Sequence, residues 1–250
     1  MPKFCANLTW LFTELDPLER FAAAKDYGFD IVEMLSPYDL PAQDIVARLA
    51  QYGQDMALIN CPPPNYTGGP RGFAAVAGSE ARFQQDFRRT LRYATMLKAK
   101  FIHVMAGEGQ GPEDEARFIA NLQYAADHAP GQALTIEPLH PADAPGYFLN
   151  DYYQAKDLLG KIDRPNVHLQ FDAYHVHLIH GDVPGVWQDV QSLVAHIQIA
   201  QAPDRSEPKK GPIDYPAFFK VLDASDYAGC VSCEYKPAVE TGAGLGWMKS

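Results

Sequence analysis

The segment Leu134-Thr135-Ile136-Glu137-Pro138-Leu139 is an apolar run that carries a single carboxylate, with a proline directly behind that carboxylate. It alternates polar and apolar residues, as a strand does when its two faces meet different surroundings. Three further segments share this design: His168-Leu169-Gln170-Phe171-Asp172, His196-Ile197-Gln198-Ile199 and Val231-Ser232-Cys233-Glu234. Each segment carries a side chain that can offer oxygen to a metal ion. We interpret these four side chains as one site built from four parallel strands; they are Glu137, Asp172, Gln198 and Glu234.

Side-chain parity divides the residues of these segments between two faces. One face is apolar and is expected to pack against outer helices; it holds Leu134, Ile136, Leu169, Phe171, Ile197 and Val231. The other face is polar and is expected to point inward; it holds Thr135, Glu137, Gln170, Asp172, Gln198, Ser232 and Glu234. The carboxylates therefore share the inward face of the predicted sheet.

Strand-like and helix-like runs alternate along the whole chain. We expect strands over residues 4–7, 30–34, 56–61, 101–105, 133–139, 167–172, 196–200 and 230–234. Helical spacing of apolar residues predicts helices over residues 15–27, 42–52, 79–97, 111–127, 151–162, 186–194 and 215–222. This alternation over 250 residues is typical of an α/β fold that closes into a single (β/α)8 TIM barrel, and we expect one domain over residues 1–250. The structural alternative, an open doubly wound sheet, would carry a glycine-rich phosphate turn after the first strand, and this chain lacks one.

Composition and charge argue against several classes of function. The chain is 47% hydrophobic and 21% charged, and its formal net charge is −10, whereas a nucleic-acid-binding protein normally shows a basic surplus. Its apolar runs fall short of the roughly 18 residues of a membrane span, and the short apolar run at the N-terminus is unlike a signal peptide. We expect a cytoplasmic protein with no nucleic-acid or membrane partner; the sequence leaves a homo-oligomer open.

The four cysteines lie at positions 5, 61, 230 and 233, all in strand-like runs. We expect them to be buried free thiols. Cys230 and Cys233 form a C-x-x-C pair, but an odd separation along a strand places them on opposite faces. A zinc or redox function for this pair is therefore not favoured.

The carboxyl ends of the strands are where barrel enzymes place their catalytic groups. Polar side chains near the expected strand ends are Asn7, Glu33, Asn60, His103, Glu137, Asp172, Gln198 and Glu234. Three carboxylates that converge in a barrel mouth would repel one another unless they lie apart or a cation sits between them. Three carboxylates and an amide oxygen suit a hard divalent ion such as Mg²⁺ or Mn²⁺. The alternative is that one or two of them cap neighbouring helices or pair with surface cations.

The motifs of this chain resemble those of the hydroxypyruvate isomerase family, within the xylose-isomerase-like TIM barrel superfamily. The matching segments run from end to end: Ala6-Asn7-Leu8, Arg71-Gly72, Ile136-Glu137-Pro138, Asp172-Ala173-Tyr174-His175, His196-Ile197-Gln198-Ile199-Ala200, Arg205-x-Glu207-Pro208 and Cys233-Glu234-Tyr235-Lys236-Pro237. The resemblance implies that Glu137, Asp172, Gln198 and Glu234 hold a divalent metal and that the two glutamates also donate and accept protons. One departure is Gln201, where the resemblance leads us to expect an acidic residue, and the tail after Lys236 is short.

The resemblance further implies an aldose–ketose type isomerisation of a small hydroxy-oxo acid through an enediolate. The substrate would be hydroxypyruvate, which gives tartronate semialdehyde, or 2-oxotetronate, which gives 3-oxotetronate. A divalent metal would stabilise the enediolate; Mg²⁺ and Mn²⁺ are favoured, and Co²⁺ and Zn²⁺ stay open. One glutamate would remove the α-proton, and the other would return a proton to the adjacent carbon.

Seven further side chains are candidates for binding the substrate: His175, Arg205, Arg71, Lys236, Asn7, Asn60 and His103. His175, expected in the loop beyond its strand, could bond a substrate oxygen. The two arginines could hold a carboxylate by bidentate bonds, with Lys236 as a third cation, although loop arginines are often only solvated. The long glycine-rich loop over residues 65–78 is expected to act as a lid.

Three other functions remain alternatives. A ketose 3-epimerase or an inosose dehydratase-like enzyme of the same superfamily would use the same metal geometry, but a carboxylate-binding arginine favours an acid over a neutral sugar. A metal-dependent nuclease would need more histidine ligands and a basic face, which the net charge of −10 opposes. A non-catalytic metal-binding barrel would have no need of two acid/base glutamates.

Overall fold

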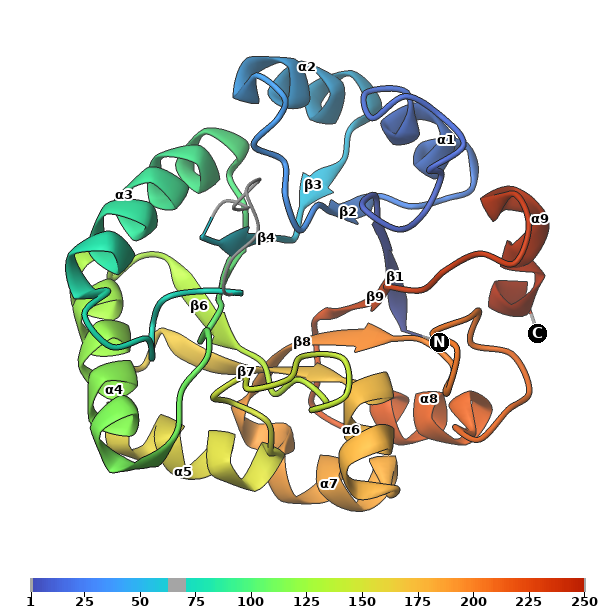
Figure 1. Cartoon of the computed structure of the whole chain (residues 1–250). Helices are drawn as coiled ribbons and strands as arrows, with labels where there is room; N and C mark the ends of the chain where they lie inside the picture. The colour runs from blue at the N-terminus through green and yellow to red at the C-terminus, as the bar shows by residue number, and fades with distance from the viewer. Residues whose placement is uncertain (1, 63–70, 250) are drawn as a thin grey trace.

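A computed structural model gives the structure of residues 2–62 and 71–249, and it shows a barrel of parallel strands with helices around the outside (Figure 1). The strands are β1 (Lys3–Asn7), β2 (Ile31–Glu33), β3 (Asp55–Met56), β4 (Leu58–Cys61), β5 (Phe101–Val104), β6 (Ala133–Ile136), β7 (Val167–Asp172), β8 (Val194–Ile199) and β9 (Cys230–Cys233). The helices are α1 (Arg20–Asp26), α2 (Ala42–Tyr52), α3 (Glu80–Leu97), α4 (Gly111–His128), α5 (Tyr152–Ile162), α6 (Ala173–His180), α7 (Val183–Val190), α8 (Tyr215–Asp223) and α9 (Thr241–Gly244), with 3₁₀ turns η1 (Gln191–Leu193) and η2 (Leu245–Lys249). The expected (β/α)8 TIM barrel is confirmed.

The strands follow one another around the barrel in the order β3-β2-β1-β9-β8-β7-β6-β5-β4, and the paired strands are parallel. The third expected strand, residues 56–61, is split into two pieces: β3 pairs with β2, and β4 pairs with β5. The chain just beyond β2 meets β4, because the Met34 amide donates to the Leu58 carbonyl (3.2 Å) and the Asn60 amide donates to the Leu35 carbonyl (3.0 Å). The split strand therefore brings the two edges of the sheet together into a nearly closed ring.

The first helix is shorter than expected. The prediction of a helix over residues 15–27 was wrong for its first part, since α1 begins only at Arg20 and the residues before it form turns and bends. Pro17 explains the difference: it has no amide hydrogen, and it disfavours a helical conformation in the residue before it. Pro138 acts similarly on β6, which ends at Ile136 instead of extending to residue 139.

The helix expected over residues 186–194 is found as α7, which begins at Val183 and ends at Val190, and an additional helix, α6, starts directly after β7. Asp172 is the N-cap of α6, because its Oδ1 accepts a hydrogen bond from the Tyr174 amide at 2.9 Å. Gly181 ends the helix with a left-handed φ of 74°. His175 therefore lies in the first turn of a helix, and its expected place in a loop was wrong.

Two apolar clusters hold the barrel together. The larger one packs the outward faces of the strands against the helices and includes Ile136, Phe171 and Cys233. The smaller one fills the interior near the start of the strands and includes Cys5, Phe101 and Cys230. The four cysteines are free and buried, as expected. Cys230 and Cys233 belong to different clusters, which confirms that they lie on opposite faces of β9.

A layer of buried polar side chains lies inside the barrel above the smaller cluster, and its members are Glu33, Thr135, Gln170, His196 and Gln198. The inward direction predicted for Thr135, Gln170 and Gln198 is confirmed by their bonds to one another and to Glu33. His196 Nε2 lies 2.6 Å from Glu33 Oε2. Burial opposes protonation of His196, but the Glu33 carboxylate and the Cys230 thiol together outweigh burial and raise the pKa of His196 to about 10. The imidazole is thus the counter-charge of Glu33.

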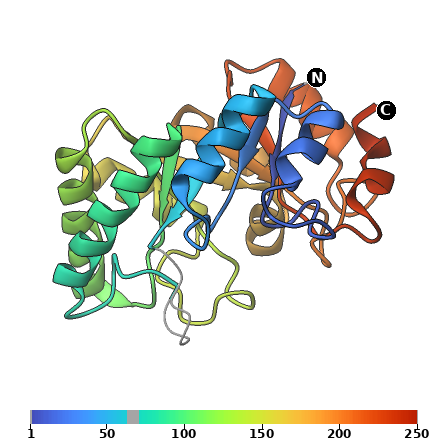
Figure 2. The same ribbon diagram turned by 90° about the horizontal axis from the view of Figure 1, so that it is seen from above.

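The segments that follow β5 and β6, together with residues 71–79 before α3, extend from one end of the barrel, below the strands in Figure 2. Gly72 forms an isolated bridge with Ala106, and Glu108 forms one with Tyr147. Gly72 has a φ of 108°, and an added Cβ would meet the Met105 carbonyl oxygen at 2.2 Å, so only glycine fits this crossing. None of the helices formed by residues 2–62 and 71–249 is long and apolar enough to cross a membrane.

Candidate active site

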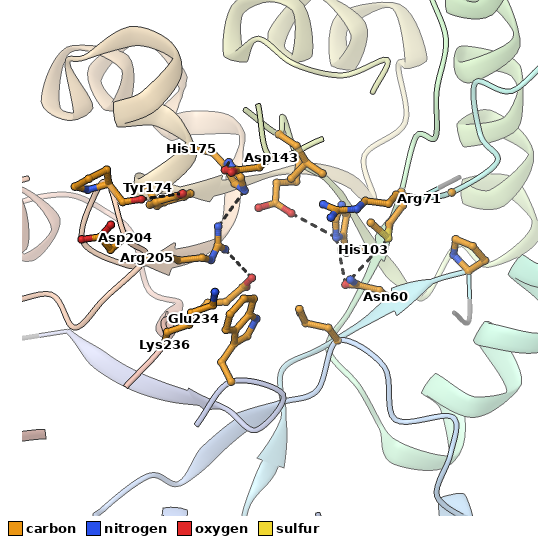
Figure 3. A pocket seen from close by; sticks show the side chains of 18 of the residues that line it. Asn60, Arg71, His103, Asp143, Tyr174, His175, Asp204, Arg205, Glu234 and Lys236 are labelled. Carbon is orange, nitrogen blue, oxygen red and sulfur yellow. Dashed lines mark hydrogen bonds and ion pairs between the residues drawn. The ribbon is translucent and has the colours of Figure 1, made fainter. Parts of the chain in front are cut away.

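A cavity of about 950 Å³ opens at the carboxyl ends of the strands. Its lining includes Glu137 from the end of β6, Glu234 from the end of β9, and His175 from α6. Figure 3 shows Arg205, Glu234 and Lys236 on one side of the cavity and Arg71, Asn60 and His103 on the other. This is the end of the barrel at which the sequence predicted the site.

Glu137, Asp172 and His175 form the tightest group of potential ligands, since one ligand atom from each lies within 4.8 Å of the others. All three side chains are buried. The His140 backbone amide donates to His175 Nδ1 at 3.1 Å, and burial lowers the pKa of His175 to about 4. Arg205 Nη1, which can only donate, lies 3.2 Å from His175 Nε2. Both ring nitrogens of His175 therefore face a donor, although a neutral imidazole has one acceptor nitrogen. Nε2 lies between the Arg205 guanidinium and the Asp172 carboxylate, whose Oδ2 is 3.8 Å away.

Arg205 is the cation that the structure places among the site carboxylates. Its Nη2 donates to Asp172 Oδ2 at 2.8 Å and to Glu234 Oε1 at 2.7 Å. Burial would lower the pKa of Arg205, but Asp172 and Glu234 together raise it above the ordinary value. The guanidinium also stands 4.7 Å from the Tyr174 ring centroid and 5.5 Å from that of Trp10. These contacts hold it toward Asp172 and Glu234, so its expected role in binding the substrate carboxylate remains a prediction.

One arginine does not balance three buried carboxylates. Burial, followed by the charges of Asp172 and Glu234, raises the pKa of Glu137 well above its ordinary value. Burial, which outweighs the favourable charge of Arg205, raises the pKa of Glu234 to about 8. Glu234 Oε2 is buried and has no hydrogen-bond partner among the described residues. An uncompensated oxygen in an acidic, buried cluster is what a divalent cation would satisfy, so the donor set fits one.

Gln198 is fully buried and, like Asp172, is not part of the cavity lining, whereas Glu137 and Glu234 line it. Its Nε2 donates to Glu33 Oε1 at 2.9 Å, and its Oε1 accepts from Gln170 Nε2 at 2.6 Å. Gln170 also donates to Glu137 Oε2 at 3.0 Å. The structure therefore links Gln198 to Glu137 through one side chain, and its direct ligation of a metal remains a prediction.

Four of the other predicted side chains line the cavity, and one, Asn7, does not. Asn60 and His103 line the cavity and contact each other, with Asn60 Oδ1 at 3.2 Å from His103 Nδ1. Burial lowers the pKa of His103 to about 3, so this imidazole is neutral. Arg71 and Lys236 line the cavity and are exposed. Asn7 is buried away from the cavity and donates to Glu33 at 2.8 Å, so a direct substrate contact is not supported by its position.

The lid expected over residues 65–78 lies only partly within the described structure. Residues 65–70 are outside the described residues. Residues 71–78 run past the end of β5, where Gly72 bridges to Ala106. This places Arg71 at the edge of the cavity, while the predicted lid motion stays a prediction.

Sequence reasoning missed Trp10 and the role of Gln201. Trp10 lines the cavity, and its ring centroid is 5.9 Å from Lys236 Nζ; its position just past the end of β1 was the available signal. Gln201 is buried and ties together the loop that carries Arg205, since its Nε2 donates to the carbonyls of Lys209 (2.7 Å) and Ile213 (3.0 Å). Its Oε1 accepts from the Ile213 amide at 2.9 Å. A carboxylate could only accept, so an amide at this position suits the loop of this chain.

Comparisons with known proteins agree with this architecture. The family described as xylose isomerase-like TIM barrel matches residues 21–250. The chain is 41% identical over 255 residues to the 2-oxo-tetronate isomerase of Cupriavidus necator, with 100% of this chain and 98% of that protein covered. It is 37% identical to the hydroxypyruvate isomerase of Escherichia coli, with coverage of 99% and 98%. A crystal structure named AP endonuclease, family 2, from Brucella melitensis is 40% identical, with a TM-score of 0.96 and coverage of 100% and 98%.

Proposed function

The chain belongs to the xylose isomerase-like TIM barrel family, and from this premise we propose that it isomerises a small hydroxy-oxo acid with the help of a divalent metal. The full-length relatives named above are isomerases of 2-oxo-tetronate and of hydroxypyruvate, and we propose the same substrate class here. The observation that carries the proposal is the pair of buried glutamates, Glu137 and Glu234, that line one cavity. They follow β6 and β9, which are separated by β7 and β8 in the ring.

The proposed reaction moves one hydrogen between adjacent carbons. One glutamate in its ionised form takes the proton from the hydroxyl-bearing carbon, and this leaves an enediolate. The other glutamate gives a proton to the neighbouring carbon, which was the carbonyl carbon. The hydroxyl proton shifts between the two oxygens, so the product is an isomer and no external oxidant or reductant takes part. The raised pKa values of both glutamates suit groups that hold a proton for part of the cycle.

Glu137, Asp172 and Glu234 would hold the divalent ion, with Gln198 as a fourth ligand. Bound there, the ion would stabilise the negative charge that develops on the substrate oxygens. His175 would contact a substrate oxygen through Nε2, the ring nitrogen that faces Arg205 Nη1 at 3.2 Å, while its Nδ1 is held by the His140 amide. Arg205 would keep Asp172 and Glu234 in place through its two bonds at 2.8 and 2.7 Å.

The test of this function is a substrate panel assayed in deuterated water with Mg²⁺ or Mn²⁺ added. The panel holds hydroxypyruvate, 2-oxotetronate and a neutral ketohexose. We expect isomerisation of at least one acid, with deuterium incorporated at the carbon next to its carbonyl group, as followed by NMR. Deuterium incorporation into the ketohexose alone would instead identify a sugar epimerase, and the absence of exchange from every compound would contradict an enediolate mechanism.

The substrate carboxylate is expected to be held by the exposed cations of the cavity, Arg71 and Lys236, because Arg205 Nη2 is occupied by two carboxylates. Changing Arg71 to lysine keeps the charge but removes the planar fork. We expect a fall in kcat/KM on the acid of about 10-fold or more, the size of one lost hydrogen bond to a charged group. Lys236→Met should cause a comparable fall, seen mainly as a higher KM.

The control for this prediction is Arg92→Lys, an exposed arginine in α3 that does not line the cavity. Its kcat/KM should stay within about 2-fold of the wild-type value, since it contacts no reacting group. If Arg71→Lys and Lys236→Met both keep full kcat/KM, the carboxylate is bound elsewhere, and Arg205 becomes the next residue to test.

A further inference from the structure

A chain of buried hydrogen bonds below the cavity connects Glu33 to Glu137. Glu33 Oε1 accepts from Gln198 Nε2 at 2.9 Å, and Gln198 Oε1 accepts from Gln170 Nε2 at 2.6 Å. Gln170 Nε2 also donates to Glu137 Oε2 at 3.0 Å, and its own Oε1 accepts from Thr135 at 2.9 Å. These side chains are buried, so bulk solvent does not replace a partner that is lost.

Glu33 ends this chain as an acceptor that is surrounded by donors. Asn7 Nδ2 donates to Glu33 Oε1 at 2.8 Å, and the Thr9 backbone amide fixes the orientation of Asn7 by donating to its Oδ1 at 3.0 Å. His196 Nε2 lies 2.6 Å from Glu33 Oε2. A carboxylate only accepts hydrogen bonds. Gln198 must therefore turn its NH2 group toward Glu33 and its oxygen in the opposite direction.

The orientation of Gln198 matters because of the residues on its other side. Gln198 is the register partner of Asp172 on the neighbouring strand, and its oxygen shares a donor with Glu137. The oxygen end thus faces the acidic cluster. An amide with the opposite orientation would present two N–H groups to that cluster, and N–H groups cannot bind a cation.

We propose that Glu33, held by His196, is a positioning residue that orients the Gln198 amide so that its oxygen is presented to the divalent cation. The inference deepens the proposed function and rests on it. Glu33 does not line the cavity and acts only through Gln198. A carboxylate is needed at position 33 because it only accepts hydrogen bonds. It therefore prevents Gln198 from turning its amide oxygen toward position 33.

Glu33→Gln is the first variant to test, because a glutamine side chain offers both an oxygen and an NH2 group and so permits either orientation of Gln198. The readout is the affinity of the purified full chain for Mn²⁺, measured from the electron paramagnetic resonance signal of the free ion. We expect the Mn²⁺ affinity to fall about 10- to 100-fold, the range found when partners of metal ligands are changed.

A second starting variant, Gln198→Glu, separates an effect on the orientation of the side chain at position 198 from a general effect on packing. In Gln198→Glu the side chain at position 198 has oxygen at both ends, so it needs no orientation, but it faces the Glu33 carboxylate at close range. Adding Glu33→Gln in this background supplies an N–H donor and removes the repulsion between like charges. We expect the double variant to bind Mn²⁺ at least as tightly as Gln198→Glu alone. Glu33→Gln should therefore weaken Mn²⁺ binding in the wild-type protein, but leave it unchanged or strengthen it in Gln198→Glu.

The control is Ser232→Ala, a fully buried residue that pairs in register with Gln198 from β9; its Mn²⁺ affinity should stay within about 2-fold of wild type. Equal losses from Glu33→Gln in both backgrounds would overturn the inference, as would unchanged affinity in the single variant. If Glu33→Gln does not fold, the inference is tested by comparing the Mn²⁺ affinities of Gln198→Glu and the double variant. Weaker Mn²⁺ binding by the double variant would overturn the inference. Absence of Mn²⁺ binding by the wild-type protein would contradict the proposed function, and the inference with it.

Discussion

Glu137→Gln and Glu234→Gln are each expected to lower the rate of isomerisation by at least about 10²-fold, because positioned acid/base groups typically contribute about 10²- to 10⁴-fold. Both side chains are buried in the cavity and directly follow strands that are three steps apart in the ring. A glutamine at either position has similar shape but cannot accept the α-proton. Its amide oxygen can still contact a cation, so both variants should keep some metal affinity.

Proton exchange separates the two roles of each glutamate. In deuterated water, one of the two variants is expected to exchange the α-proton of one isomer although overall turnover is lost, because its remaining glutamate still begins the reaction from that side. Metal affinity and deuterium incorporation should be measured on the same preparations. Near-normal turnover in either metal-loaded variant would show that the two-glutamate mechanism is wrong for this protein.

Glu108→Gln provides the matched control for these variants. Glu108 is an exposed glutamate in the segment after β5, at the same end of the barrel, and it does not line the cavity. Its replacement makes the same change in side-chain chemistry and in formal net charge as the two cavity variants. We expect its kcat/KM to stay within about 2-fold of the wild-type value, since it touches neither substrate nor metal-site residues.

Metal removal is expected to have the second large effect. Wild-type protein treated with a chelator should lose isomerase activity and regain it when Mg²⁺ or Mn²⁺ is added. The ion should also raise the melting temperature, because it binds the folded state and relieves repulsion between Glu137, Asp172 and Glu234. Metal at about 100 times its Kd adds about 2.7 kcal/mol, which for a chain of this length corresponds to about 5–10 °C.

Asp172→Asn is the control variant for the thermal shift. Asp172 also caps α6 and pairs with Arg205, so this variant should itself be less stable without metal. The quantity to compare is the difference in melting temperature with and without Mn²⁺, which should be much smaller in Asp172→Asn than in the wild type. A wild-type melting temperature that ignores Mg²⁺ and Mn²⁺, together with activity that survives chelation, would contradict a metal site here.

Local patterns in the sequence were enough to predict the barrel and the face that carries the site. Alternation along a strand is a property of the backbone, so the inward direction of Thr135, Gln170 and Gln198 followed from parity alone. Parallel strands end at the same edge of the sheet, so Glu137 and Glu234 were expected at one mouth, where the cavity is found. The errors in the predicted bounds of helices also had local causes. Pro17 delays the start of the first helix, and Asp172 caps α6, which the sequence analysis did not predict.

Only the tertiary structure decided which side chains bond to which. Arg205 reaches Asp172 and Glu234 from a loop 33 and 29 positions away, and His196 meets Glu33 across 163 positions. The Gln198 amide donates to Glu33 and accepts from Gln170, and the sequence of a single strand does not reveal these partners. These contacts depend on the closure of the ring and on side-chain torsions, and neither is encoded in the period of a local pattern. The sequence by itself thus determined the fold and the identity of the acidic groups, whereas the packing of distant strands determined their partners and their pKa values.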